Sequence, residues 1–252
     1  MKVSIITATY NSEKLVVDAI NSLISQTYSD IQSVLIDGAS KDGTVALVEK
    51  SFLNSKISSK IISEPDQGIY DALNKGINNA DGDIIGFLHA DDLYDNCDVI
   101  SKVVSLFKKN PDLQSLYGDL VYVQKENTAK VVRYWQSGEC SHVEMKKGWM
   151  PPHPAFFVRK EVYEKFGLFD TSYNIAADYD FMMRVLYKGG ISTAYIPEVF
   201  IKMRVGGASN KSLKNIWRKS KEDLRAMKTN ELGGVATLVN KNFRKIPQFF
   251  KK

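Results

Sequence analysis

The stretch Gly82-Asp83-Ile84-Ile85-Gly86-Phe87-Leu88-His89-Ala90-Asp91-Asp92 decides the fold. An apolar run of strand length follows a Gly-Asp turn and ends at two adjacent carboxylates, Asp91 and Asp92. Such a run is typical of a sheet that is covered on both faces, and open sheets of this kind bind ligands beyond the carboxyl ends of their strands. Two carboxylates at that edge attract a cation, although Asp is also a common cap of a following helix.

Strands and helices alternate through the first 110 residues. The apolar runs predict buried strands at 3–8 and 83–88 and two further short strands at 33–36 and 60–63. Apolar residues at helical spacing predict helices from about residue 12 and at 45–52, 69–80 and 99–107. This alternation is the pattern of a parallel sheet with helices on its faces.

Beyond Asn110 the pattern changes to longer β-rich segments, at 115–123 and 130–135, with no helix between them. We therefore expect a mixed central sheet with helices on both faces. Shorter elements follow, predicted as strands at 155–158 and 191–201 and as helices at 161–166 and from about residue 178.

The composition is that of one large α/β domain with an appended C-terminal segment. A chain of 252 residues that is 44% hydrophobic can bury a sizeable core. We expect no signal peptide, because a strand begins at Val3 with no charged-then-apolar leader, and no apolar run approaches the ~20 residues that span a bilayer. Cys97 and Cys140 form no paired motif, which suggests reduced thiols and a cytoplasmic protein.

The positive charge is concentrated in the tail. Residues 211–252 hold 12 Lys or Arg against 3 Asp or Glu, so residues 1–210 carry −4 of the net charge of +5. Two amphipathic helical patterns run through this tail, with Leu213, Ile216, Trp217, Leu224 and Met227 in the first, and Val235, Leu238, Val239, Phe243 and Ile246 in the second, followed by Phe249 and Phe250. Such helices either pack on their own domain or bind an anionic bilayer surface. Nucleic acid is a poorer partner, because no recognition fold accompanies the charge.

Polar side chains follow the predicted parallel strands and should share one rim of the sheet. They are Thr9, Tyr10, Asp37, Asp91 and Asp92. An aromatic ring can stack on a base, a carboxylate can accept from base or ribose groups, and a cation between carboxylates and phosphates suits a diphosphate. The chain has neither a Walker A lysine loop nor a G-x-G-x-x-G fingerprint, which removes the usual support for ATP hydrolysis and dinucleotide redox chemistry.

Several motifs, in their order, resemble those of the family 2 glycosyltransferases. They are Ser4-Ile5-Ile6-Thr7-Ala8-Thr9-Tyr10-Asn11, Leu35-Ile36-Asp37-Gly38-Ala39-Ser40 with Asp42-Gly43-Thr44, Leu73-Asn74-Lys75-Gly76, and His89-Ala90-Asp91-Asp92. The resemblance covers roughly residues 1–207. It implies the A-type glycosyltransferase fold, an inverting reaction and a nucleotide-sugar donor.

The resemblance also implies a metal site at the end of the quoted stretch. Residues 90–92 would be the tail of the D-x-D motif, with Asp91 as the ligand of Mn²⁺ or Mg²⁺ and Asp92 in support. His89 stands where many members carry the first Asp. Imidazole can ligate Mn²⁺ or hydrogen-bond the ribose, and a satisfied polar group at a strand end is the structural alternative.

The catalytic base is assigned in the same way. Asp178 resembles the Asp of the family's Glu-Asp motif, with Ala177 in place of the Glu. Displacement at an anomeric carbon requires that the acceptor hydroxyl lose its proton, which a carboxylate can accept. Asp180 is the alternative base, and helix capping is the alternative role of both residues.

Further assignments complete the predicted site. The residues that bind the nucleotide sugar would be Thr9, Tyr10, Asn11, Asp37, Asp66, Asn74, Asp91 and Arg204. The residues that bind the acceptor would be Trp149, His153 and Tyr179. Core packing is the alternative role of Trp149.

The sequence therefore predicts a catalytic domain at 1–210, with a nucleotide-binding half to about residue 110 and an acceptor half at 111–210, and a basic helical tail at 211–252. We expect an inverting, metal-dependent enzyme that transfers one sugar, from a UDP-sugar by preference, to a glycan or lipid-linked precursor of cell-surface polysaccharide. It would work in the cytoplasm or at the inner face of the cell membrane. A nucleotidyltransferase or a degenerate sugar-nucleotide-binding scaffold are the alternatives. The processive Gln-x-x-Arg-Trp signature is absent.

Overall fold

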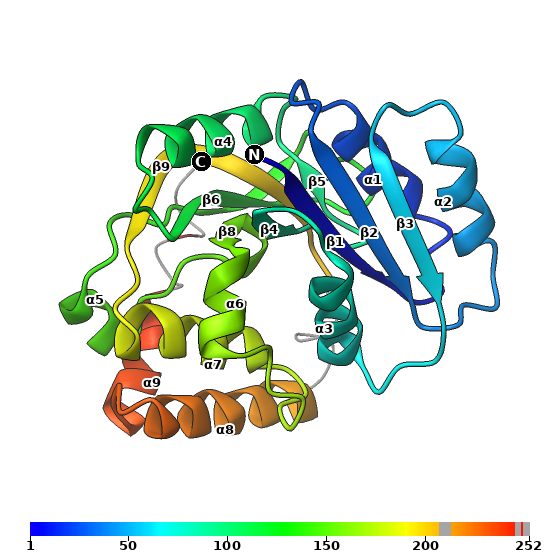
Figure 1. The fold of residues 1–252 in the computed structure, drawn as a ribbon. Coiled ribbons are helices and arrows are strands. Elements are labelled where there is room, and N and C mark those ends of the chain that lie inside the picture. Colours follow the sequence, from blue (N-terminus) through cyan, green and yellow to red (C-terminus); the bar gives the residue numbers. More distant parts are fainter. Residues whose placement is uncertain (207–212, 245–247, 249–252) are drawn as a thin grey trace.

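Among the described residues, a mixed sheet of nine strands forms the centre of the protein (Figure 1). The computed structural model describes residues 1–206, 213–244 and 248. The strands are β1 (Val3–Thr9), β2 (Ile31–Asp37), β3 (Ser58–Ser63), β4 (Ile84–Phe87), β5 (Leu93–Tyr94), β6 (Ser115–Val123), β7 (Val131–Trp135), β8 (Phe156–Arg159) and β9 (Thr193–Arg204). Their order in the sheet is β3-β2-β1-β4-β8-β6-β9-β5, with β7 paired to β6.

Helices connect these strands. They are α1 (Val16–Ile24), α2 (Thr44–Phe52), α3 (Ile69–Asn79), α4 (Val99–Lys109), α5 (His142–Lys146), α6 (Lys160–Phe166), α7 (Ala177–Met182), α8 (Leu213–Thr229) and α9 (Val235–Phe243). A 3₁₀ turn, η1 (His153–Ala155), precedes β8, and a π-helical segment, η2 (Met183–Lys188), continues α7. The sequence patterns predicted most of these elements but not β5, α5 or η1.

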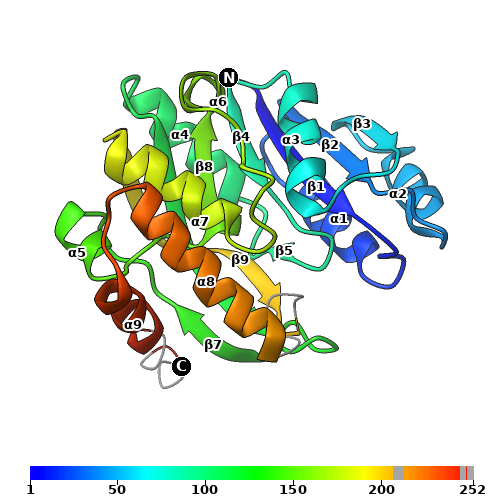
Figure 2. The same cartoon turned by 90° about the horizontal axis from the view of Figure 1, so that it is seen from below.

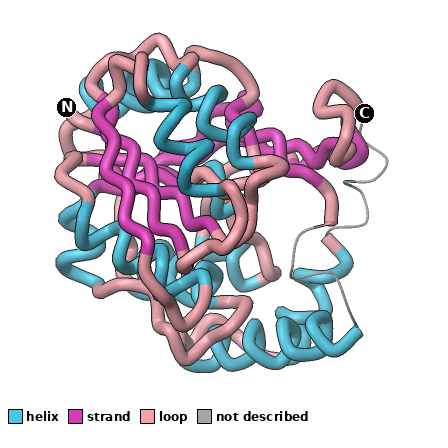
Figure 3. Tube along the Cα trace, turned by 90° about the vertical axis from the view of Figure 1, so that its right-hand side faces the viewer, coloured by secondary structure: helices cyan, strands magenta, loops and turns pink. Residues whose placement is uncertain are grey.

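The N-terminal half is the predicted parallel unit. β1 pairs in parallel with β2 and with β4, and β2 pairs in parallel with β3. Because Thr9 lies opposite Asp37 in this register, the carboxyl ends of the strands meet at one edge. Figure 3 shows these strands side by side with helices on either side of them.

Two apolar layers cover the two faces of the sheet. One layer joins α1, α2 and α4 to strand residues such as Ile5 and Ile84. The other joins α3, α6 and α7 to their sequence neighbours Ile6 and Ile85. Since alternate strand residues point to opposite faces, both faces need apolar side chains, and the strands therefore read as continuous apolar runs.

Gly86, in the stretch 82–92, has a packing role in the central strand. A Cβ atom at Gly86 in β4 would lie 2.5 Å from the ring of Phe157 in β8. The glycine therefore allows the ring to lie against the backbone of the central strand, as glycines in strand interiors often do. It couples β4 to β8 at the junction between the two halves of the sheet.

The C-terminal half adds the antiparallel part. β8 pairs antiparallel with β4 and with β6, and β7 forms an antiparallel pair with β6. β9 runs parallel to β6 over its whole length, with register shifts near Asp119. The predicted mixed sheet is thus confirmed.

The C-terminal helices pack on the same body. α8 lies against α7, and α9 packs beside α8 (Figure 2). Ala226 and Met227 of α8 are buried in the apolar layer that contains α7. Of the predicted tail, 211–212, Ile246, Phe249 and Phe250 lie outside the described residues. Within the described part of the chain, no helix combines the length and the apolar character needed to cross a bilayer.

Candidate active site

A cleft of about 1130 Å³ opens at the carboxyl edge of the parallel strands. Ligand pockets typically enclose ~300–1,000 Å³, so this cleft lies slightly above the upper end of that range. Nine of the predicted site residues line it, namely Thr9, Tyr10, Asn11, Asp66, Asp91, His153, Asp178, Tyr179 and Arg204. The other four, Asp37, Asn74, Asp92 and Trp149, are not part of its wall.

Asp37 lies behind the wall of the cleft. Its buried carboxylate accepts hydrogen bonds from Thr9 Oγ1 at 3.0 Å, Ser63 Oγ at 2.7 Å, and the backbone N–H and hydroxyl of Ser40 at 2.9 and 2.5 Å. Burial would raise the pKa of Asp37, but these hydrogen bonds outweigh it and lower the pKa below its usual value. An ionised Asp37 therefore fixes Thr9 and the turn that follows β2.

An aromatic ring and a carboxylate mark one end of the cleft. Tyr10 is 62% exposed. Asp66 accepts the backbone N–H of Gly68 at 2.8 Å through Oδ1, while its Oδ2 would lie 2.5 Å from a Cβ atom at Gly38. That Cβ would also lie 3.4 Å from the Tyr10 ring, so the two side chains approach each other over Gly38. A planar base can stack on such a ring and donate to such a carboxylate.

The adjacent carboxylates after β4 point to different environments. Asp91 faces the cleft, whereas Asp92 is fully buried and neither of its carboxylate oxygens has a partner among the described residues. Burial raises the pKa of Asp92 well above its ordinary value, and the charge of Asp91 raises it further, against a smaller opposing effect of Arg204. Of the pair, Asp91 is therefore the member that a ligand in the cleft can reach.

Two histidines lie next to these acids. The ring centroids of His89 and His153 are 6.2 Å apart, and both line the cleft. His153 packs between Phe87 and Phe169, with centroid separations of 4.9 and 5.5 Å. Burial lowers the pKa of His153 to about 4, with Asp178 opposing and His89 adding to the shift, and burial also lowers the pKa of His89. Both imidazoles are neutral near pH 7.

This burial predicts an acid-sensitive fold. The unfolded chain protonates His153 near pH 6.5, whereas the folded chain does so only near pH 4. The contribution of the neutral His153 to the free energy of unfolding is therefore fully present above pH 6.5 and is lost as the pH falls toward 4. Between pH 7.5 and pH 5 the free energy of unfolding should fall by about 2 kcal/mol for this reason. A His153→Phe variant, which keeps a ring between Phe87 and Phe169, should lose that much less stability over the same interval. Urea unfolding of both proteins at both pH values measures this, and equal losses would contradict it.

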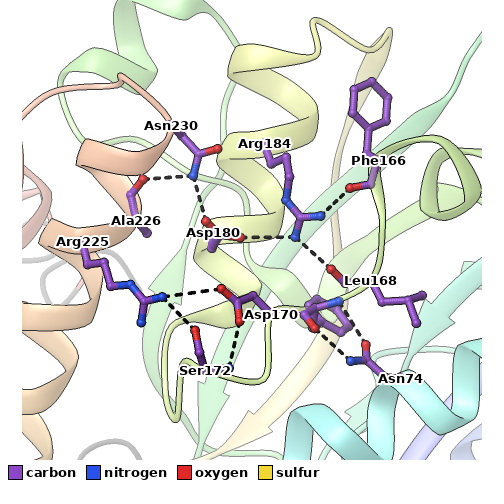
Figure 4. Close-up of polar contacts among 11 residues, drawn as sticks. Asn74, Phe166, Leu168, Asp170, Ser172, Asp180, Arg184, Arg225, Ala226 and Asn230 are labelled. Atoms are coloured by element: carbon purple, nitrogen blue, oxygen red, sulfur yellow. Dashed lines mark hydrogen bonds and ion pairs between the residues drawn. The ribbon is translucent and has the colours of Figure 1, made fainter.

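Asp178 lies in the first turn of α7 and faces the cleft. The hydroxyl of Tyr70, from α3, lies 3.0 Å from Asp178 Oδ1 and 2.7 Å from the carbonyl oxygen of Ile175, and shares its proton between them. Asp180 is buried instead, and its carboxylate contacts Arg184 at 3.2 Å and Asn230 at 2.9 Å (Figure 4). Of the two candidate bases, Asp178 is thus the one that reaches the cleft.

The predicted acceptor residues fall into two groups. His153 and Tyr179 line the cleft, and the ammonium group of Lys241 lies 3.2 Å from the centre of the Tyr179 ring. Trp149 is buried outside the cleft, where its indole N–H donates to the carbonyl of Ser137 at 2.6 Å. It lines a separate hollow of about 160 Å³.

Arg204 and Asn74 make structural contacts. The buried guanidinium of Arg204 donates to Asp18 at 2.5 Å, to the Lys125 carbonyl at 3.1 Å and to the Asp91 carbonyl at 3.0 Å, so it fixes the backbone of Asp91. The amide of Asn74 exchanges two hydrogen bonds with the backbone of Phe169, at 2.9 and 3.0 Å (Figure 4).

The C-terminal helices form part of the wall, which was not predicted. Asn215, Arg218, Lys219 and Asp223 of α8 and Lys241 of α9 line the cleft. Lys241 and Asp223 form a buried ion pair at 2.8 Å. The helical spacing of apolar residues predicted both helices, but it gives no indication of the surface on which they pack.

The residues around Asp91 fit a divalent cation. Asp91 and His89 present a carboxylate and a neutral imidazole to the same cleft. Among the described residues no group of three His, Cys, Asp or Glu side chains could enclose a metal. Mg²⁺ is usually bound through one or two carboxylates plus substrate phosphates, and Mn²⁺ accepts imidazole as well as oxygen ligands. A site completed by a substrate diphosphate is consistent with this pair.

Comparisons with known proteins identify a family for this chain. The model of glycosyl transferase family 2 matches residues 4–167. A PGL/p-HBAD biosynthesis glycosyltransferase of Mycobacterium bovis is 28% identical over 208 residues, which cover 82% of this chain and 78% of that protein. A glycosyltransferase of Mycobacterium tuberculosis is 30% identical over 192 residues, which cover 72% of this chain and 68% of that protein.

Solved structures share the fold. S. aureus TarS 1-349 in complex with UDP-GlcNAc superposes with a TM-score of 0.72 at 19% identity, over 91% of this chain and 65% of that one. The mannosyltransferase PcManGT of Pyrobaculum calidifontis, solved with GDP-Man and Mn²⁺, gives a TM-score of 0.66 at 18% identity, over 99% of this chain and 73% of that one. The predicted A-type glycosyltransferase fold is confirmed, and the chain belongs to glycosyl transferase family 2.

Proposed function

We propose that this glycosyltransferase moves a single sugar from a nucleotide diphosphate sugar, a UDP-sugar by preference, to a hydroxyl of a glycan or lipid-linked precursor, with inversion. The observation that carries the proposal is the pairing of two acids in one cleft. Asp91 reaches the cleft from the end of β4, and Asp178 reaches it from α7.

The two acids suit the two ends of an inverting displacement. Asp178 accepts the proton of the acceptor hydroxyl while that oxygen attacks the anomeric carbon, and the bond from this carbon to the diphosphate breaks. Asp91 and His89 would hold Mn²⁺ or Mg²⁺, which when bound neutralises charge on the diphosphate. Arg204 keeps the backbone of Asp91 in place.

The other end of the cleft suits the base of the donor. Tyr10 offers an exposed ring, and Asp66 offers a carboxylate oxygen next to it. Solved structures that share the fold include complexes with UDP, UDP-GlcNAc and GDP-Man, which supports a nucleotide sugar as the donor class. Asp37 does not line the cleft, but its carboxylate accepts a hydrogen bond from Thr9, which does.

A thermal-shift screen tests the donor. The purified protein is heated with UDP-, GDP- and dTDP-sugars, each with Mn²⁺ or with EDTA, because a ligand that binds only the folded state raises Tm. We expect stabilisation by one nucleotide family, larger with Mn²⁺ than with EDTA. No shift with any of them would argue against a nucleotide-sugar donor, a shift without sugar transfer would favour the scaffold alternative, and turnover of a nucleoside triphosphate would favour the nucleotidyltransferase alternative.

The surface of the C-terminal helices supports a lipid-linked acceptor at the inner face of the cell membrane. Val235, Val239 and Phe243 of α9 recur at intervals of four residues and are 64%, 44% and 64% exposed. Arg218 and Lys219, on α8, line the cleft and have no ion-pair partner among the described residues. An exposed apolar stripe on a helix of a segment as rich in Lys and Arg as 211–252 is what an anionic bilayer surface attracts.

This placement predicts binding to anionic vesicles. The protein should sediment with phosphatidylglycerol vesicles and not with phosphatidylcholine vesicles, and Phe243→Glu should weaken that binding several-fold, because it removes apolar contact and adds a repelled charge. Leu53→Glu is the control, since Leu53 is 77% exposed at the end of α2. Equal binding of both variants would argue against this surface.

A further inference from the structure

The carboxylate of Glu222, on α8, binds the turn that precedes α7. Its Oε2 accepts the backbone N–H groups of Asn174 at 3.1 Å, Ile175 at 2.8 Å and Ala176 at 3.1 Å. Glu222 is 9% exposed, and it is not part of the wall of the cleft. Hydrogen bonds from backbone N–H groups to a carboxylate are charge-assisted and among the stronger ones in proteins. These three bonds therefore fix the path of residues 174–176.

The turn bound by Glu222 leads directly to Asp178. Ala176 is the residue before the first turn of α7, which contains Asp178. The carbonyl of Ile175 and the carboxylate of Asp178 share the hydroxyl proton of Tyr70. A displacement of this turn would therefore move Asp178 both through the backbone and through Tyr70.

Other contacts hold α8 to the same segment independently of Glu222 (Figure 4). Asn230 donates to Asp180 at 2.9 Å. Arg225 donates to Ser172 at 2.8 Å and lies 3.7 Å from Asp170. The apolar residues Ala226 and Met227 are buried in the layer that contains α7. Removing the Glu222 carboxylate should thus leave α8 docked and release only the turn.

We infer that Glu222 is a positioning residue of the active site, which holds the backbone before Asp178 so that its carboxylate meets the acceptor hydroxyl. The inference rests on the proposed function, in which Asp178 receives the acceptor proton. It makes the C-terminal helix a component of the catalytic machinery rather than an appended tail. The matched family model ends at residue 167 and does not extend to Glu222.

The test separates positioning from folding and from donor binding. Glu222→Ala and Glu222→Gln are compared with Glu231→Gln, a control just beyond the end of α8 whose side chain is 80% exposed. Release of nucleotide from UDP-GlcNAc, UDP-glucose and GDP-mannose with Mn²⁺ gives kcat, with water as the acceptor. Calorimetry gives the Kd for UDP and GDP, and thermal unfolding gives Tm.

Glu222→Ala should lower kcat about 10²-fold, because a misplacement of about 1 Å can cost that much. The Kd for nucleotide should stay within twofold. The side chain of Glu222→Gln still accepts N–H groups through its amide oxygen but carries no charge. Its kcat should therefore lie between that of Glu222→Ala and that of Glu231→Gln, which should equal the wild-type value. A kcat of Glu222→Ala within twofold of wild type, or an equal loss in kcat and nucleotide affinity, would overturn the inference.

Failure of the inference can be distinguished from failure of the proposed function. If Asp178→Asn loses turnover while Glu222→Ala keeps it, only the positioning role of Glu222 is wrong. If Asp178→Asn keeps turnover, the assigned base is wrong, and the role of Glu222 falls with it. Wild-type protein that releases nucleotide from none of the three donors would overturn both.

Discussion

Replacing Asp178 with Asn should slow sugar transfer by orders of magnitude and leave nucleotide binding intact. Asn has the same shape and can still contact Tyr70, but its amide cannot accept a proton from an attacking hydroxyl. General base catalysis typically contributes ~10²–10⁴-fold, so we expect kcat to fall by that factor. The Kd for UDP should change little, because Asp178 is presented by α7 and not by the strand ends around Tyr10 and Asp91. Single-turnover assays with calorimetry measure both quantities.

Asp180→Asn is the matched control. Asp180 lies two residues along the same helix, but its carboxylate is buried between Arg184 and Asn230. Its replacement should lower Tm, because Arg184 loses a partially buried partner, and should leave kcat of the folded protein much closer to wild type. Loss of a paired buried charge is costly for stability. A loss of kcat in Asp180→Asn as large as in Asp178→Asn would contradict the choice between the two acids.

Much of the fold follows from local patterns. The strands β1, β2 and β4 are covered on both faces, so Ile5 and Ile6, or Ile84 and Ile85, are both buried, and a continuous apolar run is a strong signal. β5 has only two residues and pairs with the distant β9, and α5 has only five. Elements that short have no periodicity that a pattern can detect.

The site was harder to predict where contacts are distant in sequence. Asp91 and Asp92 are the same residue type at adjacent positions, so the sequence does not distinguish them. The turn after β4 directs Asp91 to the cleft and Asp92 into the interior. Trp149 resembles a sugar-stacking residue, yet its indole N–H bonds to Ser137 away from the cleft. Glu222 contacts a turn 46–48 residues earlier in the chain. No local spacing encodes such a contact, because it depends on how α8 docks on the finished domain.

Asp91 and Asp92 are adjacent in the chain, but only Asp91 faces the cleft. Asp91→Asn should lower turnover in Mn²⁺ by about 10²-fold or more, because a bound metal supplies several kcal/mol of charge stabilisation and Asp91 is the charged side chain that faces the cleft after β4. The variant should also lose the extra thermal stabilisation that Mn²⁺ gives in the presence of UDP. This second readout does not depend on activity.

Asp92→Asn should have the opposite result, although the two residues are neighbours. Burial raises the pKa of the Asp92 carboxyl well above its ordinary value, and Asn replaces this buried group with a neutral amide of the same shape outside the wall of the cleft. Turnover and the Mn²⁺-dependent shift in Tm should therefore stay within severalfold of wild type. If Asp92→Asn instead lost the Mn²⁺ effect and Asp91→Asn kept it, the cation would be bound by the inner carboxylate. The turn after β4 would then have to rearrange when the donor binds, because Asp92 has no access to the cleft in this conformation.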